Sequence, residues 1–273
     1  MTRPDAALYS TRHGPMWALT GDAYVTRSLE VYGEYGADEA DLFRQVVRPG
    51  MTVVEAGANI GTHSVVLARA CAPAPLIAFE PQQRVFQLLC ANLVMNQVAN
   101  AIVYPDAVGA AAGMAVIPKL DYGAAYNFGS VSVQQTAAMA WDQGQPTRIV
   151  AIDDLALPAC GFFKIDVEGF EAEVLRGATD TIARCRPALY VENDRERHQA
   201  ELIALIDTLD YVQYWHVAPL FSPKNFNGVG NDVFSGSVSL NMFCVPRESP
   251  LAITGFERID PKNWRSPVGP IPG

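Results

Sequence analysis

One glycine-containing segment combines the residue types that bind a nucleotide-like cofactor. It reads Val53-Val54-Glu55-Ala56-Gly57-Ala58-Asn59-Ile60-Gly61-Thr62-His63-Ser64, which indicates a buried strand, a tight turn and a helix. Gly57 and Gly61 let the backbone approach a ligand closely, and a helix start offers unpaired N–H groups and a positive dipole end to an anion. We expect a cofactor turn here; the plain alternative is a strand-turn-helix with structural glycines.

Glu55 indicates which cofactor the turn accepts. The pyrophosphate of a dinucleotide would meet a like charge there, with a repulsion on the order of 4 kcal/mol at ~4 Å and an effective dielectric of about 20. S-adenosylmethionine instead brings an ammonium group to the acid and a carboxylate to the helix start. The third glycine of the G-x-G-x-x-G pattern is also missing. We therefore expect S-adenosylmethionine, with Asn59 and Thr62 among its contacts; the alternative is an NAD(P)-dependent oxidoreductase.

Two further acids follow predicted strands. Glu80, in Phe79-Glu80-Pro81, comes about twenty residues after the glycine turn, where a carboxylate accepts hydrogen bonds from ribose hydroxyls. It and Pro81 are expected at the cofactor, although Glu80 also suits a cap for the helix after Pro81. Asp106 is placed to accept a hydrogen bond from an adenine amino group, while Asp beside proline is also an ordinary turn residue.

A third cluster is a candidate for catalysis. It reads Lys164-Ile165-Asp166-Val167-Glu168-Gly169-Phe170-Glu171. Strand alternation puts Lys164 and Asp166 on one face, with Asp166 at the strand tip, where ligands bind in this architecture. Glu168 is either a catalytic acid or a helix-stabilising charge in the first turn of the next helix. Lys164 is more often a salt-bridge partner than a catalytic base, and Asp153 or Asp154 is the expected partner.

Metal and histidine chemistry have weaker candidates. Asp166, Glu192 and Asn193 together offer oxygen ligands of the kind that Mg²⁺ prefers. None of the four histidines makes an i,i+4 pair or an H-E-x-x-H motif, which argues against zinc. His216, at the end of an apolar strand, is a candidate base or substrate donor, and a hydrogen-bonded structural histidine is the alternative.

The elements that position these residues alternate from residue 38 onward. The pattern predicts helices over 38–47, 60–70, 82–96, 168–177 and 195–209, and strands over 52–55, 76–79, 101–104, 162–166, 188–192, 211–217 and 237–245. The last strand is expected to close the sheet. The region 107–150 predicts short strands and a mobile loop. Short apolar strands separated by helices are typical of a parallel sheet covered on both faces, an α/β fold.

Two segments do not follow this alternation, residues 1–36 and 218–236. Both are polar, aromatic and loop-like, and functional residues often lie on such loops. We expect residues 24–36 and 216–231 to shape the acceptor pocket, with ordinary surface connection as the alternative. The expected substrate contacts are Tyr32, Asn193, Asn225 and Asn231, and Tyr35 is expected at the cofactor. Residues 1–36 are accordingly predicted as a cap and 37–273 as the catalytic domain.

Composition narrows the class of protein. The chain has 273 residues, 49% of them hydrophobic, so it can bury a substantial core. A net charge of −9 without a basic stripe argues against nucleic acid as a partner. Five cysteines without C-x-x-C spacing favour reduced thiols in the cytoplasm. No signal peptide and no apolar stretch of membrane-spanning length is found.

Residues 35–245 resemble the FkbM family of S-adenosylmethionine-dependent methyltransferases. The resemblance rests on Glu55-Ala56-Gly57-Ala58-Asn59-Ile60-Gly61, Phe79-Glu80-Pro81 and Lys164-Ile165-Asp166-Val167-Glu168-Gly169, with Glu171 and Leu175-Arg176-Gly177 behind them. It implies a Rossmann-like methyltransferase fold: a seven-stranded, mostly parallel sheet with an antiparallel last strand and helices on both faces. It also implies methyl transfer to a hydroxyl, often of a sugar or polyketide.

The resemblance further implies roles for particular residues. The glycine turn would line the methionine end of the cofactor, Glu80 its ribose and Asp106 its adenine, while Asp166 matches the family's Asp at the fourth strand. Glu55 stands where Asp is common, and Asp106 where Asn often stands, which changes the expected contacts at both places. We expect an O-methyltransferase for a small-molecule hydroxyl. A non-catalytic S-adenosylmethionine-binding protein is another possibility, and a homo-oligomer is compatible with the sequence.

Overall fold

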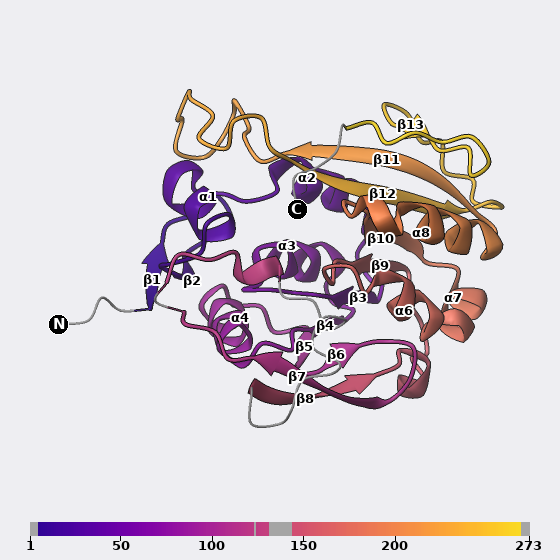
Figure 1. Ribbon diagram of the computed structural model, residues 1–273, viewed down its shortest axis with the longest axis horizontal. Coiled ribbons are helices and arrows are strands. Elements are labelled where there is room, and N and C mark those ends of the chain that lie inside the picture. Colours follow the sequence, from indigo (N-terminus) through magenta and orange to yellow (C-terminus); the bar gives the residue numbers. More distant parts are fainter. Residues whose placement is uncertain (1–4, 123, 131–143, 269–273) are drawn as a thin grey trace.

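The central element is a mixed sheet with the strand order β13-β11-β12-β10-β9-β3-β4-β5 (Figure 1). The computed structural model describes residues 5–122, 124–130 and 144–268. Within these residues the sheet has eight strands. They are β3 (Val53–Ala56), β4 (Leu76–Phe79), β5 (Ala101–Tyr104), β9 (Phe162–Ile165), β10 (Ala188–Glu192), β11 (Tyr211–Pro219), β12 (Val238–Pro246) and β13 (Glu257–Arg258).

Strand direction confirms the mostly parallel sheet with one antiparallel strand near the chain end. β5, β4, β3, β9 and β10 pair in parallel. β12 pairs antiparallel with both β10 and β11. The expectation that this last predicted strand closes the sheet is wrong, because β12 lies between two strands that precede it. β13 adds a further antiparallel strand at the edge, on β11.

Helices cover both faces of the sheet and create two apolar cores. One core contains residues of α2 (Ala37–Val46), α3 (Thr62–Cys71) and α4 (Gln83–Met95), and the other contains residues of α6 (Glu171–Arg176), α7 (Thr179–Cys185) and α8 (Glu196–Thr208). Alternate residues of one strand enter opposite cores: Val53 belongs to the first and Val54 to the second. This alternation decides the face on which each polar side chain of a strand lies.

The predicted helix 168–177 begins three residues late, at Glu171. Glu168 and Gly169 have φ angles of 60° and 91°, which is left-handed backbone that cannot continue a helix. Glu171 stabilises this turn, because its Oε1 accepts hydrogen bonds from the backbone N–H of Val167 (3.2 Å) and Gly169 (2.9 Å). The turn places Glu168 above the strand ends instead of on a helix.

The region 107–150 contains a small second sheet of β6 (Ala107–Val108), β7 (Gly113–Pro118) and β8 (Gly144–Val150), in the order β6-β8-β7. This confirms short strands in the region. The predicted mobile loop includes residues 131–143, which lie outside the described residues.

The N-terminal segment is more regular than the predicted loop. It contains the hairpin β1 (Ala6–Tyr9) and β2 (Met16–Leu19), followed by α1 (Val25–Tyr32). The hairpin lies against α4 (Figure 1), where the side chain of Asn92 bonds both the N–H and the carbonyl of Trp17. Such short strands depend on this tertiary contact, which a local sequence pattern does not reveal.

No helix within the described ranges combines the length and apolar character that crossing a bilayer requires.

Candidate active site

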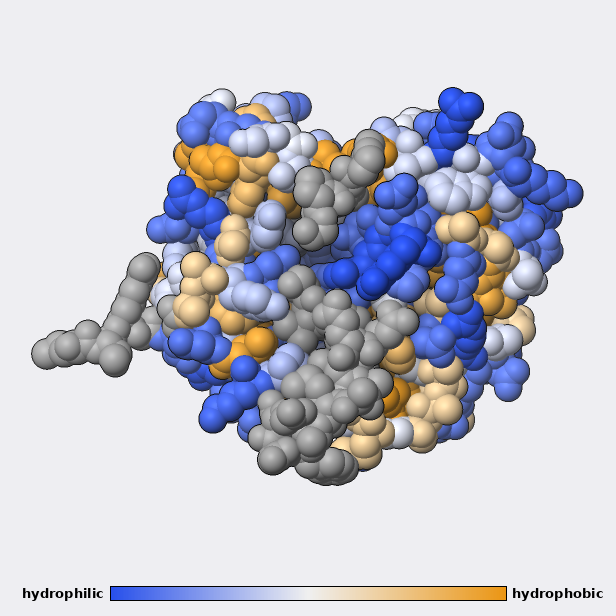
Figure 2. All heavy atoms as spheres, viewed as in Figure 1, coloured by the Kyte–Doolittle hydropathy of each residue, from blue (hydrophilic) through white to orange (hydrophobic). Residues whose placement is uncertain are grey.

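A pocket opens at the C-terminal ends of the parallel strands. Its walls come from the residues that follow β3, β4, β5 and β9, together with Gly129 and Phe170. The predicted site residues among them are Gly57, Glu80, Pro81, Asp106, Asp166 and Glu168. The face shown in Figure 2 is hollowed near its centre, and hydrophilic residues border the recess. This position, at the carboxyl ends of parallel strands, is where ligands bind in open α/β sheets.

The glycine turn packs closely against Asp166, the residue that follows β9. Gly57 has a φ of +82°, and a Cβ added there would lie 1.7 Å from the backbone oxygen of Asp166. Gly61, with a φ of +90°, precedes α3, whose first residue is the buried Thr62. Left-handed backbone favours glycine at both positions, and at Gly57 the close approach of the Asp166 carbonyl leaves no room for a Cβ. The turn therefore leads from β3 directly to the start of α3, as predicted.

Glu80 connects the glycine turn to the loop after β4. Its Oε2 accepts a hydrogen bond from the N–H of Asn59 (3.0 Å), and its Oε1 accepts one from the N–H of Gln82 (2.9 Å), which precedes α4. Burial raises the pKa of Glu80 to about 7, against the opposing effect of these two hydrogen bonds. Glu80 thus lines the pocket and bonds the residue that precedes α4, while its contact with the cofactor ribose stays a prediction.

Asp106 lines the pocket and is bound to an arginine that the sequence pattern did not single out. Arg148 of β8 donates from Nε to Oδ1 (3.0 Å) and from a terminal nitrogen to Oδ2 (2.8 Å). The Asp106 side chain is buried, whereas the arginine side chain is 67% exposed. A ligand amino group at Asp106 would share carboxylate oxygens that already accept one hydrogen bond each.

Glu55 does not line this pocket. Strand alternation directs its side chain to the α3 face, where Ser64 Oγ donates to its Oε2 (2.6 Å) and Lys164 Nζ lies 3.9 Å from its Oε1. Burial raises the pKa of Glu55 to about 7, and the Lys164 charge acts in the opposite direction. Contact between Glu55 and a cofactor ammonium group stays a prediction, and the carboxylate in this structure lies beneath the turn.

Asp166 lies at the pocket wall with Lys164 behind it. Lys164 Nζ is 2.9 Å from Asp166 Oδ2, so the expected pairing of Lys164 with Asp153 or Asp154 is wrong. Asp153 instead accepts hydrogen bonds from the N–H groups of Asp180 and Thr181 at the start of α7. The i,i+2 spacing of Lys164 and Asp166 places both on the same side of the extended chain, which explains the observed pair.

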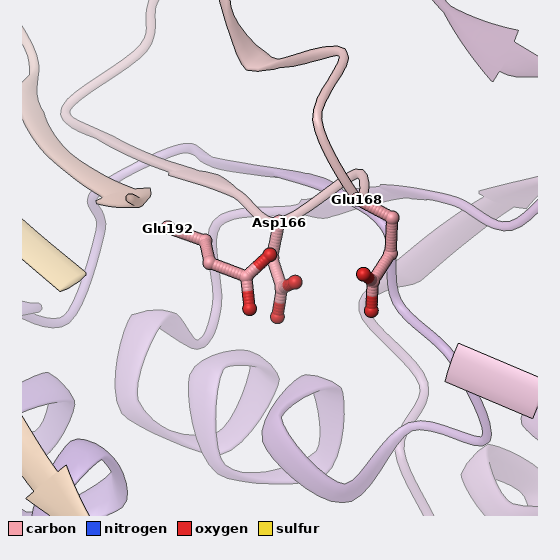
Figure 3. Close-up of side chains that lie close together, drawn as sticks. All are labelled: Asp166, Glu168 and Glu192. Atoms are coloured by element: carbon pink, nitrogen blue, oxygen red, sulfur yellow. The ribbon is translucent and has the colours of Figure 1, made fainter. Parts of the chain in front are cut away.

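Three carboxylates converge where β9 and β10 end. Oxygen atoms of Asp166, Glu168 and Glu192 all lie within 4.8 Å of one another, and Figure 3 shows the three groups pointing to the same side. Burial, followed by the Asp166 charge, raises the pKa of Glu168 to about 8 and that of Glu192 well above its usual range. Glu168 also accepts a hydrogen bond from Arg195, another residue that the sequence pattern did not single out.

Asn193 does not join these carboxylates. Its Nδ2 lies 3.3 Å from Met242 Sδ, in the core on the α8 side of the sheet, because successive residues of β10 point to opposite faces. The magnesium group expected from Asp166, Glu192 and Asn193 is therefore not assembled in that form. The same orientation separates Asn193 from its expected substrate position at the pocket.

His216 lies in a buried polar cluster and does not line the pocket. Its Nδ1 is 2.8 Å from the Tyr190 hydroxyl, which also bonds Glu39 Oε1 at 3.1 Å, and the Phe256 ring packs on it. Burial lowers the pKa of His216 to about 4. These contacts agree with the hydrogen-bonded structural histidine. The cluster also contains Glu39 of α2, whose pKa burial raises to about 7.

The two predicted acceptor segments do come together, although through backbone groups. The buried Tyr32 hydroxyl donates to the Asn231 carbonyl (3.1 Å) and accepts from the N–H of Val233 (2.7 Å). Asn225 is held inside its own loop, where it bonds both the carbonyl and the N–H of Val229. Asn231 is exposed and contributes only its carbonyl here. We name residues 5–36 and 219–237 the cap.

Tyr35, which is predicted at the cofactor, belongs to the cap and lies near acidic residues of the site. Its pKa is raised well above the usual range by burial and then by the charges of Glu39, Asp166 and Glu192. Its ring also lies 6.0 Å from that of His63. The structure therefore places Tyr35 on the acidic side of the site.

The sheet order, the glycine turn and the pocket at the parallel strand ends define a Rossmann-like α/β protein. The sequence profile described as the methyltransferase FkbM domain matches residues 55–214. The chain therefore belongs to the FkbM methyltransferase family.

The chain is also similar to individual proteins. The chain is 28% identical over 229 residues to the 31-O-demethyl-FK506 methyltransferase FkbM of Streptomyces tacrolimicus, covering 73% of this chain and 87% of the relative. Among solved structures it is similar to methyltransferase FkbM from Methylobacillus flagellatus KT (TM-score 0.44, 18% identity, 76% of this chain). It spans half the length of that chain. M. jannaschii TYW2 in complex with AdoMet has a TM-score of 0.47 and 11% identity, with 95% of this chain and 89% of that chain covered.

Proposed function

We propose that this protein is an S-adenosylmethionine-dependent O-methyltransferase for a small, uncharged molecule that carries a hydroxyl group. The single observation that supports it most is the position of Asp166. Asp166 lies in the wall of the pocket that Gly57 and Glu80 also line, and its backbone carbonyl lies against Gly57. Membership of a methyltransferase family restricts the chemistry to methyl transfer.

The residues around the pocket fit S-adenosylmethionine. The start of α3 suits the cofactor's carboxylate, and Glu80 suits the ribose hydroxyls. Gly57 lines the pocket, and the lack of a side chain lets its backbone approach the ligand closely. The converging carboxyl groups of Asp166, Glu168 and Glu192 suit the positive sulfonium and ammonium groups of the cofactor. When bound, S-adenosylmethionine supplies a methyl group from a positively charged sulfur that leaves as a neutral sulfide.

Asp166 is the proposed base. It accepts the proton that the acceptor hydroxyl loses, while Glu80 and the glycine turn orient the cofactor and the cap excludes water. Asp166 is 33% exposed, so an acceptor can reach it. Base catalysis by a positioned carboxylate is worth roughly 10²- to 10⁴-fold in rate.

The charges at the site support an uncharged acceptor. Asp166, Glu168 and Glu192 converge there, and the nearby cations Lys164 and Arg195 are each engaged by a carboxylate. A phosphate or carboxylate on the acceptor would meet carboxyl groups there and no cation that is not already paired among these residues.

Two experiments test this function. Calorimetry with S-adenosylhomocysteine and with NAD(H) tests the cofactor, and binding of NAD(H) alone would refute the methyltransferase proposal. Incubation with methyl-labelled S-adenosylmethionine and a small-molecule extract, read by mass spectrometry, tests transfer. Binding without a labelled product would favour a non-catalytic S-adenosylmethionine-binding protein.

Asp166→Asn tests the base in the same assay. With cofactor saturating, we expect single-turnover transfer to fall at least about 10²-fold. The matched control is Asp154→Asn, an exposed acid away from the pocket, which should keep the wild-type rate. An unchanged rate in Asp166→Asn would show that Asp166 is not the base.

A further inference from the structure

Lys164 is a buried cation that contacts the proposed base from the protein side. Its side chain is only 2% exposed, and its Nζ lies 2.9 Å from Asp166 Oδ2 and 3.9 Å from Glu55 Oε1. Asp166 lines the pocket, whereas Lys164 is not among the described residues that do. Lys164 therefore touches the base without reaching the ligand.

The contacts of Lys164 join the base to the cofactor turn. Glu55 on β3 and Lys164 on β9 are register partners in the parallel sheet. Glu55 in turn accepts a hydrogen bond from Ser64 Oγ at 2.6 Å, and Ser64 belongs to α3, which begins directly after the turn. One chain of polar contacts thus runs from the helix that faces the cofactor through Glu55 and Lys164 to Asp166.

A purely structural ion pair would not need this arrangement. Burying an ammonium group costs several kcal/mol unless nearby carboxylates compensate for the lost hydration. Two fully buried carboxylates would compensate for it most completely. The shortest ionic contact of Lys164 is instead with Asp166, the partly exposed acid at the pocket. A hydrogen bond to Oδ2 restrains the rotation of this carboxylate and leaves Oδ1 outside the contact with Lys164. Of the three converging carboxylates, Asp166 is the one in contact with Lys164.

We infer that Lys164 is a positioning residue for methyl transfer, whose ammonium group holds Oδ2 of Asp166 so that the other oxygen meets the acceptor hydroxyl. This inference rests on the proposed function, in which Asp166 is the base. Without Lys164 the carboxylate is free to rotate toward solvent, and a displacement of about 1 Å at a reacting group costs on the order of 10²-fold in rate.

A double-mutant cycle tests the inference. Lys164→Met and Lys164→Arg are made alone and together with Asp166→Asn, and Lys262→Met, at an exposed lysine outside the pocket, is the matched control. The readouts are single-turnover methylation of a small-molecule extract with labelled S-adenosylmethionine, and the affinity for S-adenosylhomocysteine by calorimetry.

We expect Lys164→Met to slow transfer about 10²-fold and Lys164→Arg to recover part of that loss, because it keeps the charge. The affinity for S-adenosylhomocysteine should change less than about threefold. In the Asp166→Asn background, Lys164→Met should slow transfer by less than about threefold, since two residues that act as a unit are not additive.

The outcomes separate the two proposals. Multiplicative rate losses in the double mutant, or a rate loss that follows lost cofactor affinity alone, would overturn the positioning role. If Lys164→Met melts below the assay temperature, the Lys164→Arg cycle decides in the same way. A wild-type rate in Asp166→Asn alone would instead refute the proposed base, and the role of Lys164 would fall with it.

Discussion

Gly57 lies very close to the backbone of Asp166, the residue that follows β9, and this gives a specific prediction for Gly57→Ala. Gly57 and Gly50 have nearly the same left-handed backbone, with φ angles of +82° and +85°. A Cβ at Gly57 would lie 1.7 Å from the Asp166 carbonyl oxygen, whereas a Cβ at Gly50 would meet nothing within 4 Å. The two substitutions therefore share the backbone strain and differ in the clash.

The magnitudes follow from these two contributions. Left-handed backbone costs an L-residue roughly 1–2 kcal/mol, which is all that Gly50→Ala should lose. Gly57→Ala should lose that amount and a further ~1–3 kcal/mol, because backbone atoms must move to make room. The same movement displaces the Asp166 backbone, so we also expect the affinity for S-adenosylhomocysteine to fall at least about tenfold, or 1.4 kcal/mol.

Urea unfolding and calorimetry measure both quantities. Wild type, Gly50→Ala and Gly57→Ala are compared at one pH, with the free energy of unfolding and the affinity for S-adenosylhomocysteine determined for each. Equal losses of stability in the two variants would refute the reasoning from close approach. An unchanged affinity in Gly57→Ala would show that the turn does not contact the cofactor.

Three further predictions concern Tyr32 of the cap and the carboxylate of Glu80. Tyr32→Phe leaves the Val233 N–H and the Asn231 carbonyl without their partner, so we expect a loss of roughly 1–3 kcal/mol and faster amide hydrogen exchange at residues 225–234; unchanged exchange would contradict this. Glu80→Gln replaces an acceptor of two N–H bonds by an amide that serves one of them, so the S-adenosylhomocysteine affinity measured by calorimetry should fall about tenfold. Because the pKa of Glu80 is raised to about 7 from 4.5, the folded state keeps a proton that the unfolded state has released between these values, and stability falls as pH rises through this window. The wild type should lose up to about 3 kcal/mol more than Glu80→Gln between pH 5 and 7.5 in urea unfolding, and parallel pH profiles would contradict this.

The sequence predicts the sheet better than the cap for a physical reason. The strands Leu76–Phe79 and Ala188–Glu192 agree with the prediction at both ends, because strands buried in the sheet are short apolar runs with clear limits. The β1–β2 hairpin and α1 escape prediction, since four-residue strands and a polar helix take their stability from α4 and from the distant loop at 219–237.

The candidate site divides in the same way. Gly57, Glu80 and Asp166 reach the pocket because their place at strand ends follows from topology alone. Glu55 was expected there too, but the register that places it beside Lys164 depends on which strands become neighbours. Arg148 is distant in sequence from Asp106, and nothing local announces their pairing.

The insertion of β12 between β10 and β11 has a consequence for synthesis on the ribosome. Until residues 238–246 have emerged, β10 and β11 each present an edge whose backbone N–H and C=O groups have no partner strand. The nascent chain thus completes its sheet only after more than four fifths of it has been made, and a product that terminates before residue 238 would carry two adhesive edges.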